Sequence, residues 1–128
     1  MTESFWVVPQ APTMRTPLSI LREQAAGLTR ATSGILDGEV TTKRDTSSDD
    51  LTIGLSIKVP ALNNYVYHVL EYGQPITLFP GTLWLRFNDK FFPVPDEAEL
   101  VRLLRDVLSS DAVQHIVQAL WAQARELV

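Results

Sequence analysis

The strict alternation of apolar and polar residues between positions 51 and 59 constrains the fold more than any other feature of this chain. Five branched apolar residues are each separated by one small or polar residue, and they are Leu51, Ile53, Leu55, Ile57 and Val59. A period of two is typical of a β-strand with one buried face and one wetter face. The chain must therefore build a sheet and supply apolar side chains that cover one side of it.

Further strand patterns lie on both sides of this segment. The segments predicted as strands are 35–44, 51–59, 65–72, 76–79 and 82–88, followed by a short run at Phe91-Phe92. The polar run 45–50 is typical of a turn, so the first two strands should form a hairpin. None of the connections is long enough for a helical crossover, which favours an antiparallel meander.

Three amphipathic helices are predicted around the sheet. The first begins at Thr16, whose side chain can cap it, with Pro17 in the first helical position. Near the other end of the chain, Asp96 is a suitable N-cap for a second helix, and a polar break at 109–111 separates it from the third. The two last helices carry apolar stripes at helical spacing, formed by Leu100, Leu103, Leu104, Val107, Leu108, Val113, Ile116, Val117, Leu120, Trp121 and Ala124.

These elements predict an α+β fold with an N-terminal helix, a four- to five-stranded antiparallel meander sheet and two C-terminal helices packed on the sheet. A chain of 128 residues with 45% apolar residues can bury one core, so residues 17–128 are expected to form a single domain. Residues 1–16 are expected to form an irregular N-terminal arm, because Pro9 and Pro12 oppose a helix there. The apolar run 5–8 in this arm is a candidate for a short edge strand.

Composition excludes several classes of function. The chain has no cysteine, which removes disulfides, thiolate nucleophiles and cysteine-based metal sites. Its formal net charge is −4 and its basic residues are scattered, whereas nucleic-acid binding needs a clustered basic surface. Glu3 stands where a secretory signal would be positive, and no apolar run is long enough to span a membrane. We therefore expect a cytoplasmic protein that binds neither nucleic acid nor membrane and uses no cofactor.

Residues that could carry catalysis are few. His68 is a candidate base if its strand face lines a pocket, although a hydrogen-bonded structural histidine is the simpler interpretation. His115 is expected on the polar side of the last helix. Asp37 and Glu39 would share one face of a strand, but a divalent metal needs a further ligand, so no metal site is predicted. No serine has a recognisable histidine partner and no glycine-rich phosphate loop is present, which argues against an enzyme.

The aromatic residues of the strands suggest a binding surface. If Leu83, Leu85 and Phe87 face the core, Trp84 and Arg86 stand on the opposite face of the sheet. If Val66 and Leu70 also face the core, Tyr65, Tyr67 and Val69 join them on that opposite face. If that face is uncovered, the candidate binding residues on it are Tyr65, Tyr67, Trp84 and Arg86. Tryptophan, tyrosine and arginine are enriched among the residues that dominate binding energy at protein interfaces. If helices instead cover both faces, the same aromatic residues belong to the core.

We therefore expect a non-enzymatic interaction module, such as an adaptor, a chaperone-like protein or an immunity-type small subunit, acting on another protein or as a homodimer. The alternative is a small-ligand-binding protein or enzyme with a pocket between sheet and helices, using His68, Tyr67 and Arg86. A third hypothesis places recognition in the hairpin tip from Lys43 to Asp50, because loops often carry function. A solvated turn is the simpler interpretation of that tip.

Overall fold

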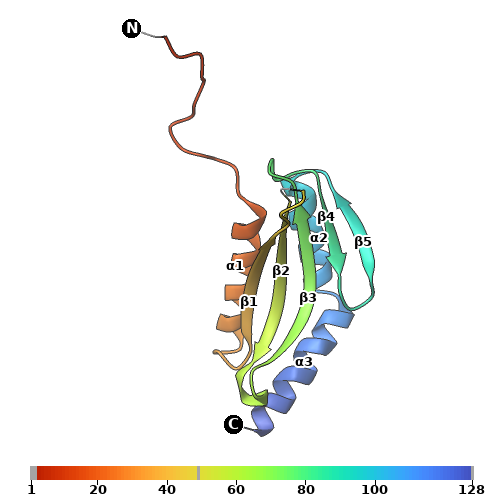
Figure 1. Cartoon of the computed structure of the whole chain (residues 1–128). Helices are drawn as coiled ribbons and strands as arrows, with labels where there is room; N and C mark the ends of the chain where they lie inside the picture. The colour runs from red at the N-terminus through yellow and green to blue at the C-terminus, as the bar shows by residue number, and fades with distance from the viewer. Residues whose placement is uncertain (1–2, 49, 128) are drawn as a thin grey trace.

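The protein has the predicted α+β fold, as the computed structural model of residues 3–48 and 50–127 shows (Figure 1). The helices within these residues are α1 (Pro17–Ala31), α2 (Glu97–Leu108) and α3 (Asp111–Glu126), with a 3-10 turn, η1 (Pro60–Leu62). The strands are β1 (Asp37–Arg44), β2 (Leu51–Val59), β3 (Tyr65–Gln74), β4 (Gly81–Leu85) and β5 (Lys90–Val94). Each strand pairs antiparallel with its neighbour in sequence, in the order β1-β2-β3-β4-β5, which confirms the meander.

The helix starts follow the predicted capping chemistry. The Thr16 side chain accepts a hydrogen bond from the backbone N–H of Ser19 at 3.1 Å, with a proline in the first turn. Asp96 caps α2 in the same way by accepting from the Glu99 N–H at 2.9 Å. Ser110 caps α3. Each cap satisfies an amide that the helix itself leaves without a partner.

The predicted strand at 76–79 is wrong, because residues 75–80 form a loop between β3 and β4. Ile76 is exposed, and Leu78 has a positive φ of 80°, which a strand does not accommodate. Prolines stand at both ends of this loop, Pro75 and Pro80, and each removes a backbone donor from the ladder that a strand would need. The loop is held instead by Tyr72 of β3, whose hydroxyl donates a hydrogen bond to the Leu78 carbonyl at 2.8 Å.

The helices of the described chain pack on one side of the sheet and leave the other side open (Figure 1). α1 lies over β1 and β2, α2 lies over the end of the sheet formed by β4 and β5, and α3 continues from α2 towards η1. The core forms between this helical layer and the sheet, and its fully buried side chains include Leu21, Leu36, Ile53, Val59, Leu70, Tyr72, Leu83, Val94 and Leu100. The alternative in which helices cover both faces of the sheet is therefore wrong.

A β-bulge in β3 changes which side chains face the helices. Leu55 of β2 pairs with Leu70, but the next residue, Ser56, pairs with His68, so Val69 has no partner on β2. An extra residue in one strand breaks the alternation of faces at that point. Val69 and Leu70 are both buried, with 2% and 0% exposure. The alternation of side chains between the two faces of the sheet is therefore shifted by one residue across the bulge.

Gly38 of β1 explains how closely α1 approaches the sheet. A Cβ built at this position would lie 2.2 Å from the Ala25 carbonyl oxygen of α1. Only glycine allows the helix backbone to rest directly on the strand backbone here. The side chain of Thr29, one turn further along α1, then receives a hydrogen bond from the Gly38 N–H at 2.9 Å.

The described part of the N-terminal arm, residues 3–16, does not dock on the sheet, so the predicted edge strand is wrong. It extends away from the domain without regular structure (Figure 1). Its last contacts with the domain are the Arg15 N–H, which donates to the Glu97 side chain at 3.2 Å, and the Arg15–Glu23 ion pair. An apolar run of four residues that ends at Pro9 offers few ladder hydrogen bonds to offset the entropy lost by ordering the arm.

Candidate functional site

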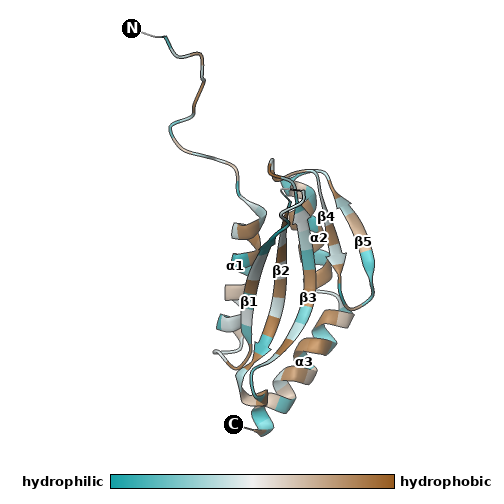
Figure 2. Cartoon of the chain, in the orientation of Figure 1, coloured by the Kyte–Doolittle hydropathy of each residue, from teal (hydrophilic) through white to brown (hydrophobic). Residues whose placement is uncertain are grey.

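The open face of the sheet is divided into a polar half and an aromatic half. Residues directly opposite one another on paired strands share a face, so the register assigns the side chains to each side. One row of the open face runs across the whole sheet through Thr41, Gly54, Glu71, Trp84 and Phe91. Hydropathy changes from residue to residue along the strands, as such a two-faced sheet requires (Figure 2). The aromatic end of this row lies on β4 and β5.

Trp84 and Phe91 form a parallel stack at this end of the row. Their ring centroids are 5.7 Å apart and the ring planes differ by 8°. Phe91 remains 62% exposed. The indole N–H of Trp84 donates a hydrogen bond to the Asp89 carboxylate at 2.7 Å, which fixes the ring orientation from the β4–β5 turn.

Arg86 completes this group by lying over the indole. Its guanidinium carbon is 4.9 Å from the centroid of the Trp84 ring, a cation–π geometry. The same guanidinium forms an ion pair with Glu71 at 3.5 Å. Both side chains remain more than 30% exposed, so water screens the pair and its contribution to stability is small. We call Trp84, Phe91 and Arg86 the aromatic stack.

The structure separates the four predicted binding residues into two sets. Trp84 lies on the open face, as the alternation in β4 predicts, and Arg86, just after the end of β4, lies over its ring. Tyr65 and Tyr67 precede the bulge and lie on the helical side, so their predicted place on the open face is wrong. Tyr65 lies beside Leu62 and two residues of α3, and Tyr67 packs against the core. The physical reason for their different position is the bulge, which no residue pattern in β3 predicts.

Phe91 was not among the predicted binding residues, although the sequence contains a signal for it. Asn88 and Asp89 lie in the reversal between two strands, and a hairpin with Leu85 opposite Lys90 places Trp84 opposite Phe91. The register of this hairpin, followed from its turn into the strands, therefore predicts that Trp84 and Phe91 lie opposite each other. The residue pattern alone predicts only a short strand at Phe91.

Ser56 and His68 form a hydrogen-bonded pair across β2 and β3, contrary to the expectation that no serine has a histidine partner. The Ser56 Oγ and His68 Nδ1 are 3.0 Å apart. Their pairing depends on the bulge, because it brings His68 opposite Ser56. Ser56 is only 2% exposed, whereas a nucleophilic serine must reach the carbonyl carbon of a substrate. The pair therefore fits the structural role considered for His68 better than catalysis.

The predicted carboxylate pair on β1 already has partners within the fold. The Glu39 carboxylate is 3.5 Å from the Lys58 ammonium group, and Asp37 accepts a hydrogen bond from the Thr29 hydroxyl at 3.1 Å. In the described residues, no cluster of three or more histidine, aspartate or glutamate side chains is arranged to hold a metal ion. Glu39 and Lys58 therefore form part of the polar half of the open face.

The tip of the β1–β2 hairpin is a local turn ordered by Asp45. Its carboxylate accepts hydrogen bonds from the Ser47 N–H at 2.9 Å and the Ser47 hydroxyl at 2.7 Å. These hydrogen bonds hold the pKa of Asp45 below its ordinary value, because they stabilise the charged form. Residue 49 of the tip lies outside the described residues. The hypothesis that this tip is a recognition element stays a prediction.

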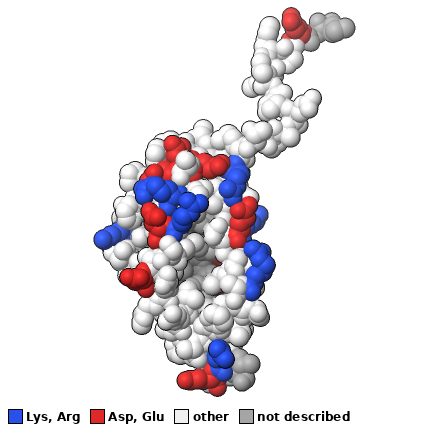
Figure 3. All heavy atoms as spheres, turned by 180° about the vertical axis from the view of Figure 1, so that it is seen from behind, with Lys and Arg blue, Asp and Glu red and all other residues white. Residues whose placement is uncertain are grey.

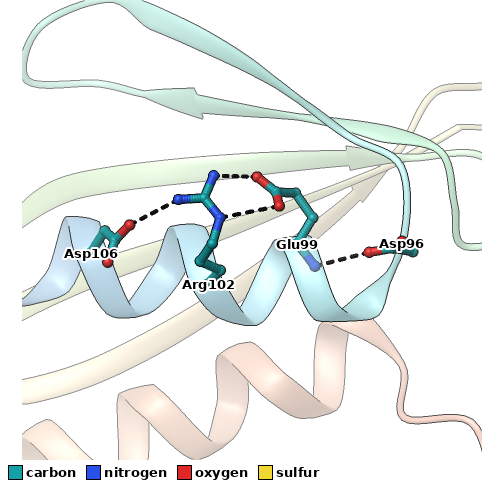
Figure 4. A network of polar contacts seen from close by, with 4 residues as sticks. All are labelled: Asp96, Glu99, Arg102 and Asp106. Atoms are coloured by element: carbon teal, nitrogen blue, oxygen red, sulfur yellow. Dashed lines mark hydrogen bonds and ion pairs between the residues drawn. The ribbon is translucent and has the colours of Figure 1, made fainter.

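The outer surface of α2 carries an exposed ion-pair network. Arg102 contacts both Glu99 and Asp106, and Asp96 accepts a hydrogen bond from the Glu99 backbone (Figure 4). The hydrogen bond from Arg102 lowers the pKa of Glu99. Residues three and four apart on a helix pair in this way on a solvated face. Charged side chains therefore gather over α2, as the view from behind shows (Figure 3).

A cavity does lie between the sheet and the helices, but the residues predicted for it are elsewhere. It has a volume of about 180 Å³ and lies between α1, α3 and the strands β2 and β3. His68 and Arg86 stand on the other side of the sheet, and Tyr67 does not line the cavity. The predicted grouping of these three residues around one pocket is therefore wrong.

Comparison with known proteins leaves the interpretation to the structure. No family model, no curated protein and no solved structure matches this chain significantly. None of the helices in the described residues is both long enough and apolar enough to cross a membrane.

Proposed function

We propose that this protein is a non-enzymatic interaction protein that binds another protein, or a second copy of itself, through the open face of the sheet. The aromatic stack would be the central contact. The observation that carries the proposal is the parallel Trp84–Phe91 pair, with Arg86 over the indole, on a sheet face that no helix within residues 3–48 and 50–127 covers.

The aromatic stack is suited to binding because its side chains are already ordered. Binding normally costs free energy for every flexible side chain that becomes fixed. Here the Trp84 ring is fixed by Phe91 on one side, by Arg86 over the ring and by the hydrogen bond to Asp89. A partner that covers Phe91 would gain roughly 25 cal/mol for each Å² of apolar surface removed from water. Tryptophan and arginine are also the residue types that most often dominate interface energies.

The polar half of the open face would form the rim of the interface. Glu39 and Lys58 present an ion pair there, and Thr41 and Lys43 lie on the same face of β1. Specific interfaces commonly surround an apolar centre with polar residues that remain partly hydrated. Partner selectivity would then depend on the charges of β1 and β2, and affinity on the aromatic stack.

A photo-crosslinking amino acid placed at position 91 tests this proposal in the cells that make the protein. Irradiation should give a defined covalent adduct, and mass spectrometry of the adduct would tell whether the partner is a second copy of this chain. The matched control is the same amino acid at position 76, since Ile76 is exposed to a similar degree, at 72%, but lies in the loop before β4.

An adduct formed at position 91 and absent at position 76 supports the proposal, provided that Trp84→Ala abolishes it. If no adduct forms at position 91, or if position 76 gives the same adducts, the open face is not the interface. Light scattering on the purified wild type would separate the two partner classes, because only self-association produces a dimer in the absence of other proteins.

A further inference from the structure

The cavity under the helices is apolar and large enough for one side chain. Its lining is mostly aliphatic, contributed by Ala25, Gly27, Leu28, Leu55, Ile57, Val69, Leu108, Val113 and Val117, and its polar members are Gln24 and Ser56. A dry apolar cavity of about 150 Å³ can accept a molecule as large as benzene. At about 180 Å³, this apolar cavity therefore fits an aromatic or branched aliphatic side chain.

Gly27 is a second sign that the apolar cavity accepts a group from outside. It lies within α1, where glycine costs up to about 1 kcal/mol relative to alanine. A Cβ at this position would meet only the end of the Arg30 side chain, at 4.0 Å, so the packing of the described structure does not require glycine. Gly38, by contrast, is required by direct contact with α1. The missing side chain of Gly27 keeps the wall of the cavity open.

A second hollow beside the apolar cavity lies at the root of the N-terminal arm. This hollow lies between α1 and α2, and its lining includes Arg15, Ile20, Gln24, Val101 and Leu104. Arg15 belongs to the arm, and Gln24 lines both the hollow and the cavity. The hollow at the root of the arm and the apolar cavity therefore lie next to each other along α1.

The arm itself carries side chains that match the apolar cavity. Phe5, Trp6, Val7 and Val8 are 90%, 85%, 97% and 74% exposed, which makes them a continuous apolar segment in water. Such segments mark sites of interaction rather than ordinary surface. Arg15 is nine positions after Trp6, and nine steps of about 3.1 Å span roughly 28 Å. The distance along α1 from Pro17 to Leu28 is roughly 16 Å at 1.5 Å per residue, so the arm is long enough to fold back.

We propose that the apolar cavity is the binding site for the chain's own N-terminal arm, with the segment Phe5–Val8 as its ligand. In the described structure the arm is in the released position, and in the docked position it runs along the hollow between α1 and α2. An aromatic ring of the segment then fills the space beside Gly27. This site lies on the helical side of the sheet, so the inference is independent of the proposed function of the open face.

Fluorine NMR on the full chain labelled with 5-fluorotryptophan tests this inference. Trp6 is assigned by the signal that disappears in Trp6→Phe, and its exposure is measured by the change in its shift between H₂O and D₂O. We expect the Trp6 signal of the wild type to be protected from solvent. We also expect the methyl signals of Leu28 and Val117 to shift in Trp6→Ala, since they would lose the ring current of the indole.

Two variants show whether the apolar cavity is responsible. Gly27→Leu fills the cavity and should move the Trp6 signal to the position of an exposed indole. Ala26→Leu adds the same side chain to the neighbouring position, which lines a different surface of α1, and should leave the signal unchanged. The arm variant, Phe5→Asp with Val7→Asp, changes only the exposed arm and should also release Trp6, so the test does not depend on the folding of Gly27→Leu.

Three results would overturn the inference. The first is a Trp6 signal as exposed in the wild type as in the arm variant. The second is protection of Trp6 that survives Gly27→Leu in a folded chain. The third is protection that disappears on dilution, because it would mean that the arm binds a second copy and not its own domain.

Discussion

Tyr72→Phe is the substitution whose effect the structure specifies most fully. Tyr72 is completely buried, and its hydroxyl donates the hydrogen bond that holds the Leu78 carbonyl in the loop before β4. Phenylalanine keeps the ring and its packing but leaves that carbonyl without its donor. A neutral hydrogen bond of this kind contributes about 1 kcal/mol. We expect the free energy of unfolding at pH 7 to fall by about 1–2 kcal/mol.

The same hydroxyl predicts a change of stability at alkaline pH. Burial raises the pKa of Tyr72 to about 12 from an ordinary value of 10. Because the pKa is higher in the folded state, the corresponding stability is complete below pH 10 and is lost as the pH rises from 10 towards 12. Two pKa units correspond to at most roughly 3 kcal/mol. The variant has no phenol at this position, so the difference between wild type and variant should shrink above pH 10 and then reverse.

Urea denaturation followed by circular dichroism, between pH 7 and pH 11.5, measures both effects. Tyr65→Phe is the matched control, since Tyr65 is 49% exposed. The Tyr65→Phe protein should be nearly as stable as the wild type at pH 7. Its free energy of unfolding should also fall with rising pH as that of the wild type does. If Tyr72→Phe loses as much stability above pH 10 as the wild type, the buried phenol is not the group responsible and the argument from burial fails.

Three other substitutions test separate parts of the structure. Gly38→Ala should lower the free energy of unfolding by about 3 kcal/mol in urea denaturation, because the new Cβ would overlap the α1 backbone; an effect near zero would contradict the close approach. Gly27→Ala should instead raise the free energy of unfolding by about 0.5–1 kcal/mol, when it is made in the arm variant so that docking of the arm does not interfere. A loss of stability would show a contact that the structure lacks. Arg102→Ala should raise the pKa of Glu99 in an NMR titration, since Arg102 stabilises the charged carboxylate. The stability that Glu99 adds is present above its ordinary pKa and is lost as the pH falls through the lower folded value, so an unchanged titration would refute the ion pair.

Much of the architecture could be predicted because its signals are local. The alternation in β2, the caps at Thr16 and Asp96 and the apolar stripes of the last helices each depend on residues close together in sequence. The prediction of a strand at 76–79 is wrong because it depended on apolar residues alone. Two prolines and the hydrogen bond from Tyr72 keep the segment in a loop.

The candidate site was harder to predict because it depends on register. The alternation in β4 predicts the face of Trp84 correctly, whereas Arg86 follows the end of β4 at Leu85 and joins this face through its contacts with Trp84 and Glu71. Tyr65 and Tyr67 were placed on the wrong face because one extra residue, Val69, reverses the phase of β3. No local pattern distinguishes a bulged strand from a regular one, so the position of these rings becomes visible only when β2 and β3 are paired.

The strand order of the sheet has a consequence for how the chain folds. Each strand pairs with the strand before or after it, and α1 packs on β1, which follows it directly. Such local pairings close short loops and favour rapid folding. The sheet can therefore grow one hairpin at a time as the chain leaves the ribosome. The helices that cover the sheet come last in the chain, so three of its apolar side chains stay uncovered until α2 and α3 are complete: Leu55, Val69 and Leu85. The partly folded chain with this apolar side exposed is therefore the folding intermediate most prone to aggregation.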